Sequence, residues 1–111
     1  MKKLTTLYLL LFVLVPLNIF SQNINISNGN VFDGEPYIAV NPYNSQHIIV
    51  AWMGYKFTQK IAIKTTVSFD GGNSWSEIVS LKHANPLFTS ADPSIAFGPN
   101  EEIYISFVDF T

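Results

Sequence analysis

The sequence predicts an all-β protein built from four-stranded antiparallel units. Three observations support this prediction. A residue pattern recurs 57 positions further along the chain, apolar and polar residues alternate over residues 61–69, and no segment has the periodicity of an amphipathic helix. Four strands in a unit of this length are typical of a β-propeller blade. The predicted fold is therefore a β-propeller of four-stranded antiparallel blades, of which the chain covers about one and a half.

The repeat lies at residues 35–42 and 92–99. Both segments follow the pattern acid-Pro-x-Ile-Ala-apolar-x-Pro, and apolar segments at 48–52 and 103–107 follow them. Each copy predicts two short strands joined by a turn rich in Asn, Pro and Gly. Because repeat units bury their faces against neighbouring units, we expect the chain to be the N-terminal part of a larger protein. The alternative is a small, self-contained β-sandwich.

The remaining strands of the first unit are predicted from residues 61–81. Alternation over residues 61–69 indicates a half-buried strand, residues 70–73 form a Gly-rich turn, and residues 75–81 are predicted to return as the fourth strand. In antiparallel order, the turns after the first and third strands lie at one end of the unit. The loop after the second strand and the linker between units lie at the other end, which we call the upper end.

The first 21 residues have the features of a secretory signal peptide. The segment begins with two lysines, is uninterruptedly apolar over residues 7–15, and ends at the small Ser21. A transmembrane anchor is the alternative, but a span needs about 20 apolar residues, and Asn18 interrupts this one. We therefore expect a secreted or periplasmic protein with no membrane span once the leader is removed.

These patterns divide the chain into four parts. Residues 1–21 are the signal peptide, and residues 22–34 are an N-terminal segment that could supply a ring-closing strand. Residues 35–91 are the first blade, and residues 92–111 are the first half of a second blade.

The composition excludes several classes of protein. The chain has no cysteine, so it has neither disulfides nor thiolate metal sites. It has no arginine, and beyond residue 21 four lysines stand against eight carboxylates. This negative balance does not suit a protein that binds nucleic acid.

Residues 68–75 fit the motif Ser-x-Asp-x-Gly-x-x-Trp at every fixed position. These positions are Ser68, Asp70, Gly72 and Trp75. An Asp carboxylate can accept hydrogen bonds from nearby backbone N–H groups in a turn, Gly can adopt a positive φ, and Trp can bury a large apolar surface beside it. The segment resembles the Asp-box, or bacterial neuraminidase repeat, of sialidase-like propellers. The resemblance covers about residues 35–107 and implies that Asp70 is structural and lies away from the active face.

The resemblance leaves catalysis open. Sialidases of this family hold the substrate carboxylate with three arginines, the first usually in a Phe-Arg-Ile-Pro-like segment on the innermost strand of the first blade. Here residues 35–38 are Glu-Pro-Tyr-Ile, and the chain contains no arginine. The family's Tyr nucleophile and its partner Glu would come from later blades. A glycoside hydrolase of the exo-sialidase type is therefore one hypothesis, and a non-catalytic module that binds a glycan or an extracellular protein is the other.

Four residues at the upper end are candidates for either role. They are Glu35, Tyr55, Phe57 and Asp92. The acids, together with Asp33, could serve a different glycosidase, although an acid before Pro can simply begin a strand. The two aromatics suit recognition of a sugar or a protein, or could instead cover the edge of a blade.

No catalytic, metal or cofactor site is assigned from the sequence. Glu35 and Asp92 occupy the same position in successive units, so a ring of such carboxylates could bind Ca²⁺ if further units repeat the motif. The alternative is that each carboxylate caps its own strand. The two histidines, His47 and His83, are predicted to be solvated loop residues.

Overall fold

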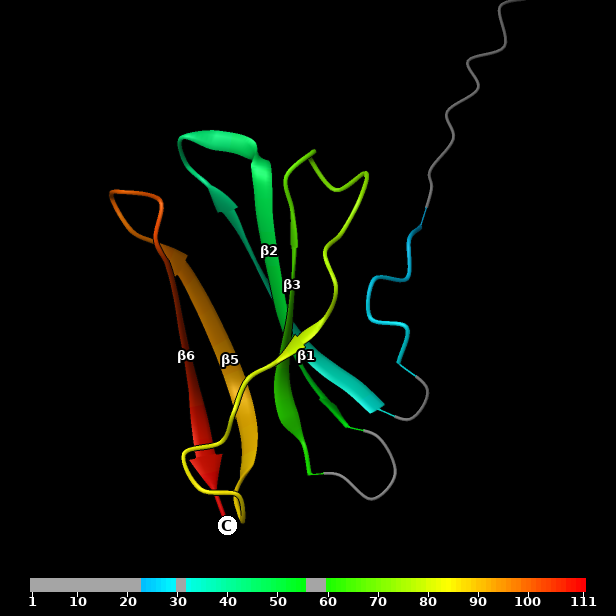
Figure 1. Ribbon diagram of the computed structural model, residues 1–111, viewed down its shortest axis with the longest axis vertical. Coiled ribbons are helices and arrows are strands. Elements are labelled where there is room, and N and C mark those ends of the chain that lie inside the picture. The colour runs from blue at the N-terminus through cyan, green and yellow to red at the C-terminus, as the bar shows by residue number, and fades with distance from the viewer. Residues whose placement is uncertain (1–22, 30–31, 56–59) are drawn as a thin grey trace, which may run out of the picture.

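The computed structural model describes residues 23–29, 32–55 and 60–111, and the described chain is all-β (Figure 1). The predicted signal peptide and Phe57 lie outside the described residues. The strands are β1 (Phe32–Asn41), β2 (Asn44–Tyr55), β3 (Ala62–Ser68), β4 (Val79–Ser80), β5 (Thr89–Phe97) and β6 (Ile103–Phe110).

The strands form two antiparallel sheets. The first sheet has the order β1-β2-β3-β4, and the second is the hairpin β5–β6. Strand β5 packs against β1, β2 and β3, so the hairpin lies beside the four-stranded sheet (Figure 1). This arrangement confirms the all-β, antiparallel class predicted from the sequence.

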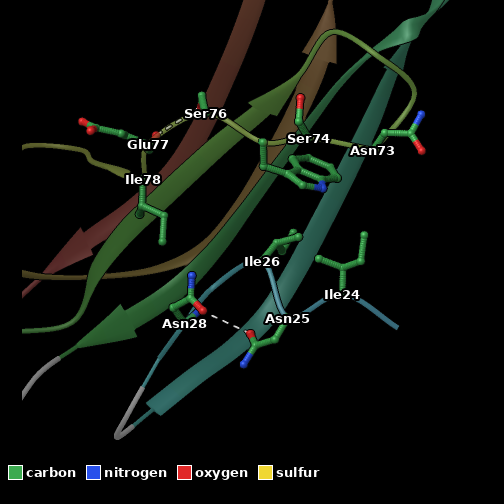
Figure 2. A pocket seen from close by; sticks show the side chains of 10 residues that line it. Ile24, Asn25, Ile26, Asn28, Asn73, Ser74, Ser76, Glu77 and Ile78 are labelled. Carbon is green, nitrogen blue, oxygen red and sulfur yellow. Dashed lines mark hydrogen bonds between the residues drawn. The ribbon is translucent and has the colours of Figure 1, made fainter. Parts of the chain in front are cut away.

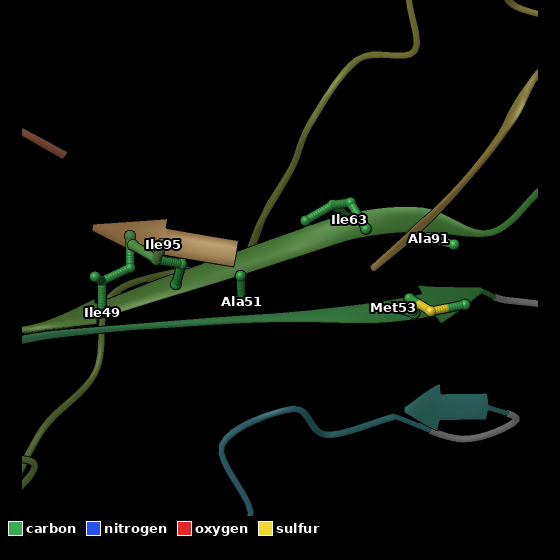
Figure 3. Packing of buried hydrophobic residues seen from close by; sticks show 6 residues of the cluster. All are labelled: Ile49, Ala51, Met53, Ile63, Ala91 and Ile95. Atoms are coloured by element: carbon green, nitrogen blue, oxygen red, sulfur yellow. The ribbon is translucent and has the colours of Figure 1, made fainter. Parts of the chain in front are cut away.

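The core lies between the two sheets. Alternate residues of each strand point into it, because successive side chains of a strand face opposite sides. Figure 3 shows the buried cluster, which consists of Ile49, Ala51, Met53, Ile63, Ala91 and Ile95. Half-buried apolar residues, among them Ala39 and Phe97, pack around this cluster. The second hairpin therefore supplies one side of the apolar core of the first sheet.

The sequence repeat has a structural counterpart in two equivalent bulges. The β1–β2 register shifts by one residue between Gly34 and Tyr37, and the β5–β6 register shifts by one between Ala91 and Ser94. The extra residues fall in the acid-Pro pairs, where Glu35 has φ +50° and Asp92 has φ +54°. Proline cannot donate to the ladder and disfavours helical geometry in the residue before it, so each pair leaves the regular pairing.

The fourth strand is much shorter than the sequence predicts. Only Val79 and Ser80 are in strand geometry, whereas residues 75–81 are expected to be. The Ser76 hydroxyl accepts a hydrogen bond from the Val67 N–H, and the Thr66 hydroxyl donates to the Ser76 carbonyl. The Ser76 N–H still donates to the Val67 carbonyl at 2.8 Å, but the Val67 N–H donates to the Ser76 hydroxyl instead of a backbone carbonyl, and regular strand pairing begins only at Val79.

Both histidines are half-buried, which corrects the prediction that they are solvated. The His47 ring stacks on Phe69 with ring centroids 4.6 Å apart, and its edge meets Phe97 at 5.0 Å. Because Phe69 follows β3 and Phe97 ends β5, His47 lies where the two sheets meet. The partners of His83 belong to a polar cluster described below.

Candidate functional site

The Ser68 hydroxyl is the centre of the turn that follows β3. Ser68 is 1% exposed, and its hydroxyl accepts a hydrogen bond from the Gly72 N–H at 2.8 Å. The same hydroxyl donates to Asp70 Oδ1 at 2.8 Å. One side chain thus binds both the backbone of the turn and its carboxylate.

The Asp70 carboxylate closes the other half of the turn. Asp70 Oδ1 accepts from the Ser74 N–H at 2.8 Å, and Oδ2 accepts from the Ser74 hydroxyl at 2.5 Å. These bonds favour the charged form, with the Ser74 hydroxyl contributing most, and they lower the pKa of Asp70 to about 2. A carboxylate with this pKa stays ionised at neutral pH and is poorly suited to proton transfer.

Two glycines allow the backbone of this turn to reverse. Gly71 has φ +73° and Gly72 has φ +94°, a region that residues with a Cβ rarely adopt. The Trp75 indole N–H then donates to the Gly72 carbonyl at 3.1 Å. The four motif residues therefore form one hydrogen-bonded structure.

The turn lies at the opposite end of the sheet from the predicted upper end. The Gly71 N–H donates to the Gln46 carbonyl at 3.0 Å, which joins this turn to the beginning of β2. The turn after the first strand and the turn after the third strand therefore lie together, as the predicted strand order requires.

A groove runs between this turn and the N-terminal segment. Its volume is about 420 Å³. In Figure 2, Ile26 of the N-terminal segment lies on one side and Ser74 on the other. The lining residues are Ile24, Asn25, Ile26, Asn28, Asn73, Ser74, Trp75, Ser76, Glu77 and Ile78.

The chemistry of the groove suits a neutral, hydroxyl-rich ligand. Three asparagine side chains line the groove; Asn25 Oδ1 accepts from the Ser27 hydroxyl and the Asn28 N–H, and Asn73 Nδ2 donates to the Asp70 carbonyl, so the Asn25 amide N–H groups and the Asn73 amide oxygen have no other bond among the described residues. A half-buried indole and three isoleucines offer apolar surface. The only charged residue of the lining is Glu77, so nothing in it is complementary to an anion. A mixture of apolar surface and a few orienting polar groups is typical of small-molecule sites.

This groove is not predicted from the sequence. Residues 22–34 are expected to supply a ring-closing strand, whereas residues 23–29 contain no strand and several of them line the groove. That role depends on a further blade, so it stays a prediction. The alternating asparagines and isoleucines of residues 23–26 are the one sequence signal that could have indicated a binding surface.

The described candidates of the upper end lie on β1, β2 and β5. Tyr55 pairs with Phe32 at the end of the β1–β2 hairpin, and their rings are 5.8 Å apart. Glu35 lies on the neighbouring β1 bulge, and Asp92 lies on the equivalent bulge of β5, which packs against β1. Both acids are exposed. They lie within their strands and not at the strand starts as predicted, because β1 begins at Phe32 and β5 begins at Thr89.

Asp33 has a structural role close to these candidates. Its Oδ1 accepts a hydrogen bond from the indole N–H of Trp52 at 2.8 Å and lies 3.9 Å from Lys64 Nζ. Trp52 is 3% exposed, so its indole N–H needs such a partner. The Asp33 carboxylate is thus occupied in binding β2 and β3.

A second polar cluster, also missed from the sequence, joins the end of β6 to the start of β5. Ser90 donates to Asp109 Oδ1 at 2.5 Å and lies 2.8 Å from His83 Nδ1, and the Ala84 N–H donates to Asp109 Oδ2 at 2.6 Å. The Ser90 hydroxyl, and after it the Ala84 N–H, lower the pKa of Asp109. One sequence feature could have indicated this cluster. Asp109 continues the inward-facing alternation of residues 103, 105 and 107 of β6, and a carboxylate at an inward position needs polar partners.

This cluster contains the residue types of a catalytic triad but not its geometry. In a triad, one imidazole nitrogen faces the serine and the other faces the carboxylate. Here the same nitrogen, His83 Nδ1, lies 2.8 Å from the Ser90 hydroxyl and 3.4 Å from Asp109. Ser90 is also 1% exposed, so no substrate can reach it. The cluster therefore stabilises the hairpin and its preceding loop.

Comparisons with known proteins add no assignment. No family model matches the chain, and neither a curated protein nor a solved structure matches it. Among residues 23–29, 32–55 and 60–111, no helix is long and apolar enough to cross a membrane. Within the same ranges, no three His, Asp or Glu side chains cluster in a way that could hold a metal ion. The Ca²⁺ hypothesis needs acids from further units and stays a prediction.

Proposed function

We propose that this chain is part of an exported, sialidase-like Asp-box propeller, and that its role is to bind neutral glycans without cleaving them. The groove between the N-terminal segment and residues 73–78 is the observation that carries the binding role. The propeller assignment rests on the resemblance of residues 68–75 to the Asp-box.

Two features of the structure support a propeller blade over a self-contained sandwich. The Ser68, Asp70, Gly72 and Trp75 bonds give the motif the structural role that the resemblance implies. In addition, the hairpin β5–β6 leaves large apolar side chains exposed on the side away from the core, including Tyr104 at 60% and Val108 at 51%. A sandwich complete in itself would present polar residues there.

Binding is better supported than hydrolysis. Asp70 is held in its charged form by hydrogen bonds, Asp33 is bonded to Trp52, and Ser90 is buried. The Tyr nucleophile and partner Glu of sialidases would come from further blades, and the groove lining holds a single carboxylate, that of Glu77. The geometry of the described residues therefore favours recognition.

Tryptophan fluorescence can test this proposal directly. Trp52 is 3% exposed, while Trp75 is half-buried at the groove, so a ligand should change the emission of Trp75 selectively. Titration with neutral oligosaccharides should give a saturable change that remains in the Trp52→Phe variant.

An asparagine variant provides the matched control. Asn25→Ala should weaken binding by about fivefold, since it removes one polar partner of the ligand. Asn44→Ala removes a similar turn asparagine outside the groove and should leave binding unchanged. No saturable signal with any neutral glycan, or release of free sugar from a glycoside substrate, would contradict the proposal.

A further inference from the structure

Three places in the chain carry an Asn or an Asp directly before a glycine. They are the pairs at residues 28–29, 33–34 and 70–71. At such a pair the backbone nitrogen of the glycine can attack the side-chain carbonyl carbon of the residue before it, because glycine has no Cβ to hinder the approach. Whether a given pair reacts then depends on how the fold holds its side chain and its backbone nitrogen.

The fold holds both Asp-Gly pairs. Asp33 Oδ1 accepts a hydrogen bond from the indole N–H of Trp52 at 2.8 Å, and Asp70 Oδ1 accepts one from the Ser74 N–H at 2.8 Å. At the second pair the attacking nitrogen is engaged as well, since the Gly71 N–H donates to a carbonyl of β2 at 3.0 Å. An ionised carboxylate is also a poor target for a nucleophile. Both pairs are therefore expected to stay intact.

The Asn28-Gly29 pair has no such protection. It lies outside every described strand, and both of its residues are exposed. The Asn28 N–H donates to Asn25 Oδ1, but the Asn28 carboxamide forms no hydrogen bond with any other described residue. The Gly29 N–H donates to the Ser27 hydroxyl at 3.3 Å, which is longer than an ordinary N–H···O bond. The carbonyl carbon and the attacking nitrogen are thus free to approach each other.

The local structure nevertheless calls for these two residues. A Cβ at position 29 would overlap the Asp33 carboxylate, so glycine is the residue that fits there. Asn28 has φ +46°, a left-handed conformation that asparagine adopts more readily than most residues. The reactive pair therefore cannot be exchanged freely for an unreactive one.

We propose that Asn28 is a site of spontaneous deamidation, through which the groove gains a second carboxylate as the protein ages. The Gly29 nitrogen loses its proton to water and bonds to Asn28 Cγ, while the Cγ–Nδ2 bond breaks and ammonia leaves. The product is a cyclic imide. Water then opens the imide at one of its two carbonyl groups, which yields either aspartate or isoaspartate, in which the peptide bond runs through the side-chain carboxyl group.

The change falls in the wall of the groove. In Figure 2, Asn28 lies on the side formed by the N-terminal segment, across from residues 73–78. A carboxylate only accepts hydrogen bonds, whereas a carboxamide also donates them, so a hydroxyl group of a bound oligosaccharide loses a donor there. The aged protein should therefore bind neutral oligosaccharides about threefold more weakly. This consequence rests on the proposed function, whereas the deamidation itself does not.

Incubation followed by peptide mass spectrometry tests the proposal. The full chain is kept at neutral and at mildly alkaline pH beside synthetic peptides of residues 25–31, 31–37 and 68–74. We expect aspartate and isoaspartate to accumulate at position 28 over days, and faster at the higher pH because the attacking nitrogen must lose its proton. A segment without protective structure opens at almost no cost in free energy, so the rate in the protein should lie within about fivefold of the rate in the free peptide. The two Asp-Gly pairs should form isoaspartate at least about tenfold more slowly in the protein than in their peptides.

Two variants separate the chemistry from the binding. Asn28→Gln keeps a carboxamide, but the ring that it would form is larger and closes much more slowly. This variant should therefore not gain the acidic form that isoelectric focusing detects in the aged wild type. Asn28→Asp, freshly prepared, should already show the weaker oligosaccharide binding of the aged wild type.

The outcomes distinguish the two proposals. An Asn28 that stays intact in the protein while the peptide converts would overturn the deamidation proposal, and so would an acidic form that accumulates equally fast in Asn28→Gln. Aged protein that binds as tightly as fresh protein would contradict the consequence for the groove. A fresh wild type that binds no neutral oligosaccharide would contradict the proposed function, and conversion at Asn28 would still support deamidation.

Discussion

Replacing Ser68 with alanine tests the hydrogen-bonded turn most sharply. The serine is 1% exposed, and its hydroxyl forms two short bonds of 2.8 Å, one from the Gly72 N–H and one to Asp70 Oδ1. The change leaves the backbone otherwise intact but removes both bonds at a buried position. At about 1 kcal/mol for each net hydrogen bond, Ser68→Ala should lower the free energy of unfolding by about 2 kcal/mol.

Urea and thermal denaturation at one fixed protein concentration measure this loss. For a domain of this size, 2 kcal/mol corresponds to a fall in Tm of roughly 10 °C. The matched control is Ser45→Ala, an exposed serine of β2, which should change the free energy of unfolding by less than about 0.5 kcal/mol. If Ser68→Ala were as stable as this control, the turn would not be held together as described.

Three further changes test other parts of the structure. Glu35→Gly should raise the free energy of unfolding by about 0.5–1 kcal/mol in urea titrations, because Glu35 has φ +50°, whereas Glu35→Ala should give no such gain. Folding lowers the pKa of Asp70 from 3.8 to about 2. The ionised Asp70 carboxylate therefore stabilises the fold fully above pH 3.8, and this stabilisation is lost as the pH falls towards 2. Asp70→Asn should remove the fall in Tm that the wild type shows over this pH range. Ser90→Ala should cost about 1–2 kcal/mol of unfolding free energy by urea denaturation, since it leaves His83 and Asp109 without their shared partner.

The sequence predicts the parts of the structure that depend on local pattern and on the repeat. The hairpins β1–β2 and β5–β6 follow from the acid-Pro motif and its apolar strands, and the alternation over residues 61–69 contains β3. The position of the Asp70 turn beside the start of β2 follows from the antiparallel strand order. In each case residues close in sequence, or a repeated pattern, specify the geometry.

The remaining features depend on contacts between distant parts of the chain. The short β4 arises because the Ser76 hydroxyl takes the place of a ladder acceptor, which apolar patterning does not reveal. The burial of His47 depends on Phe97 in the second sheet, and the Ser90–Asp109 bond joins residues on two strands. The groove needs the N-terminal segment to approach residues 73–78, an approach that no local pattern predicts.

Binding of a neutral glycan in the groove beside the Asp70 turn can be located residue by residue. An isotope-labelled sample is titrated with a neutral oligosaccharide and followed through its backbone amide NMR signals. If the groove is the binding site, saturable shifts should be concentrated in residues 24–28 and 73–78. Shifts concentrated instead around Glu35, Tyr55 and Asp92, or no shifts with any neutral glycan, would contradict binding in the groove.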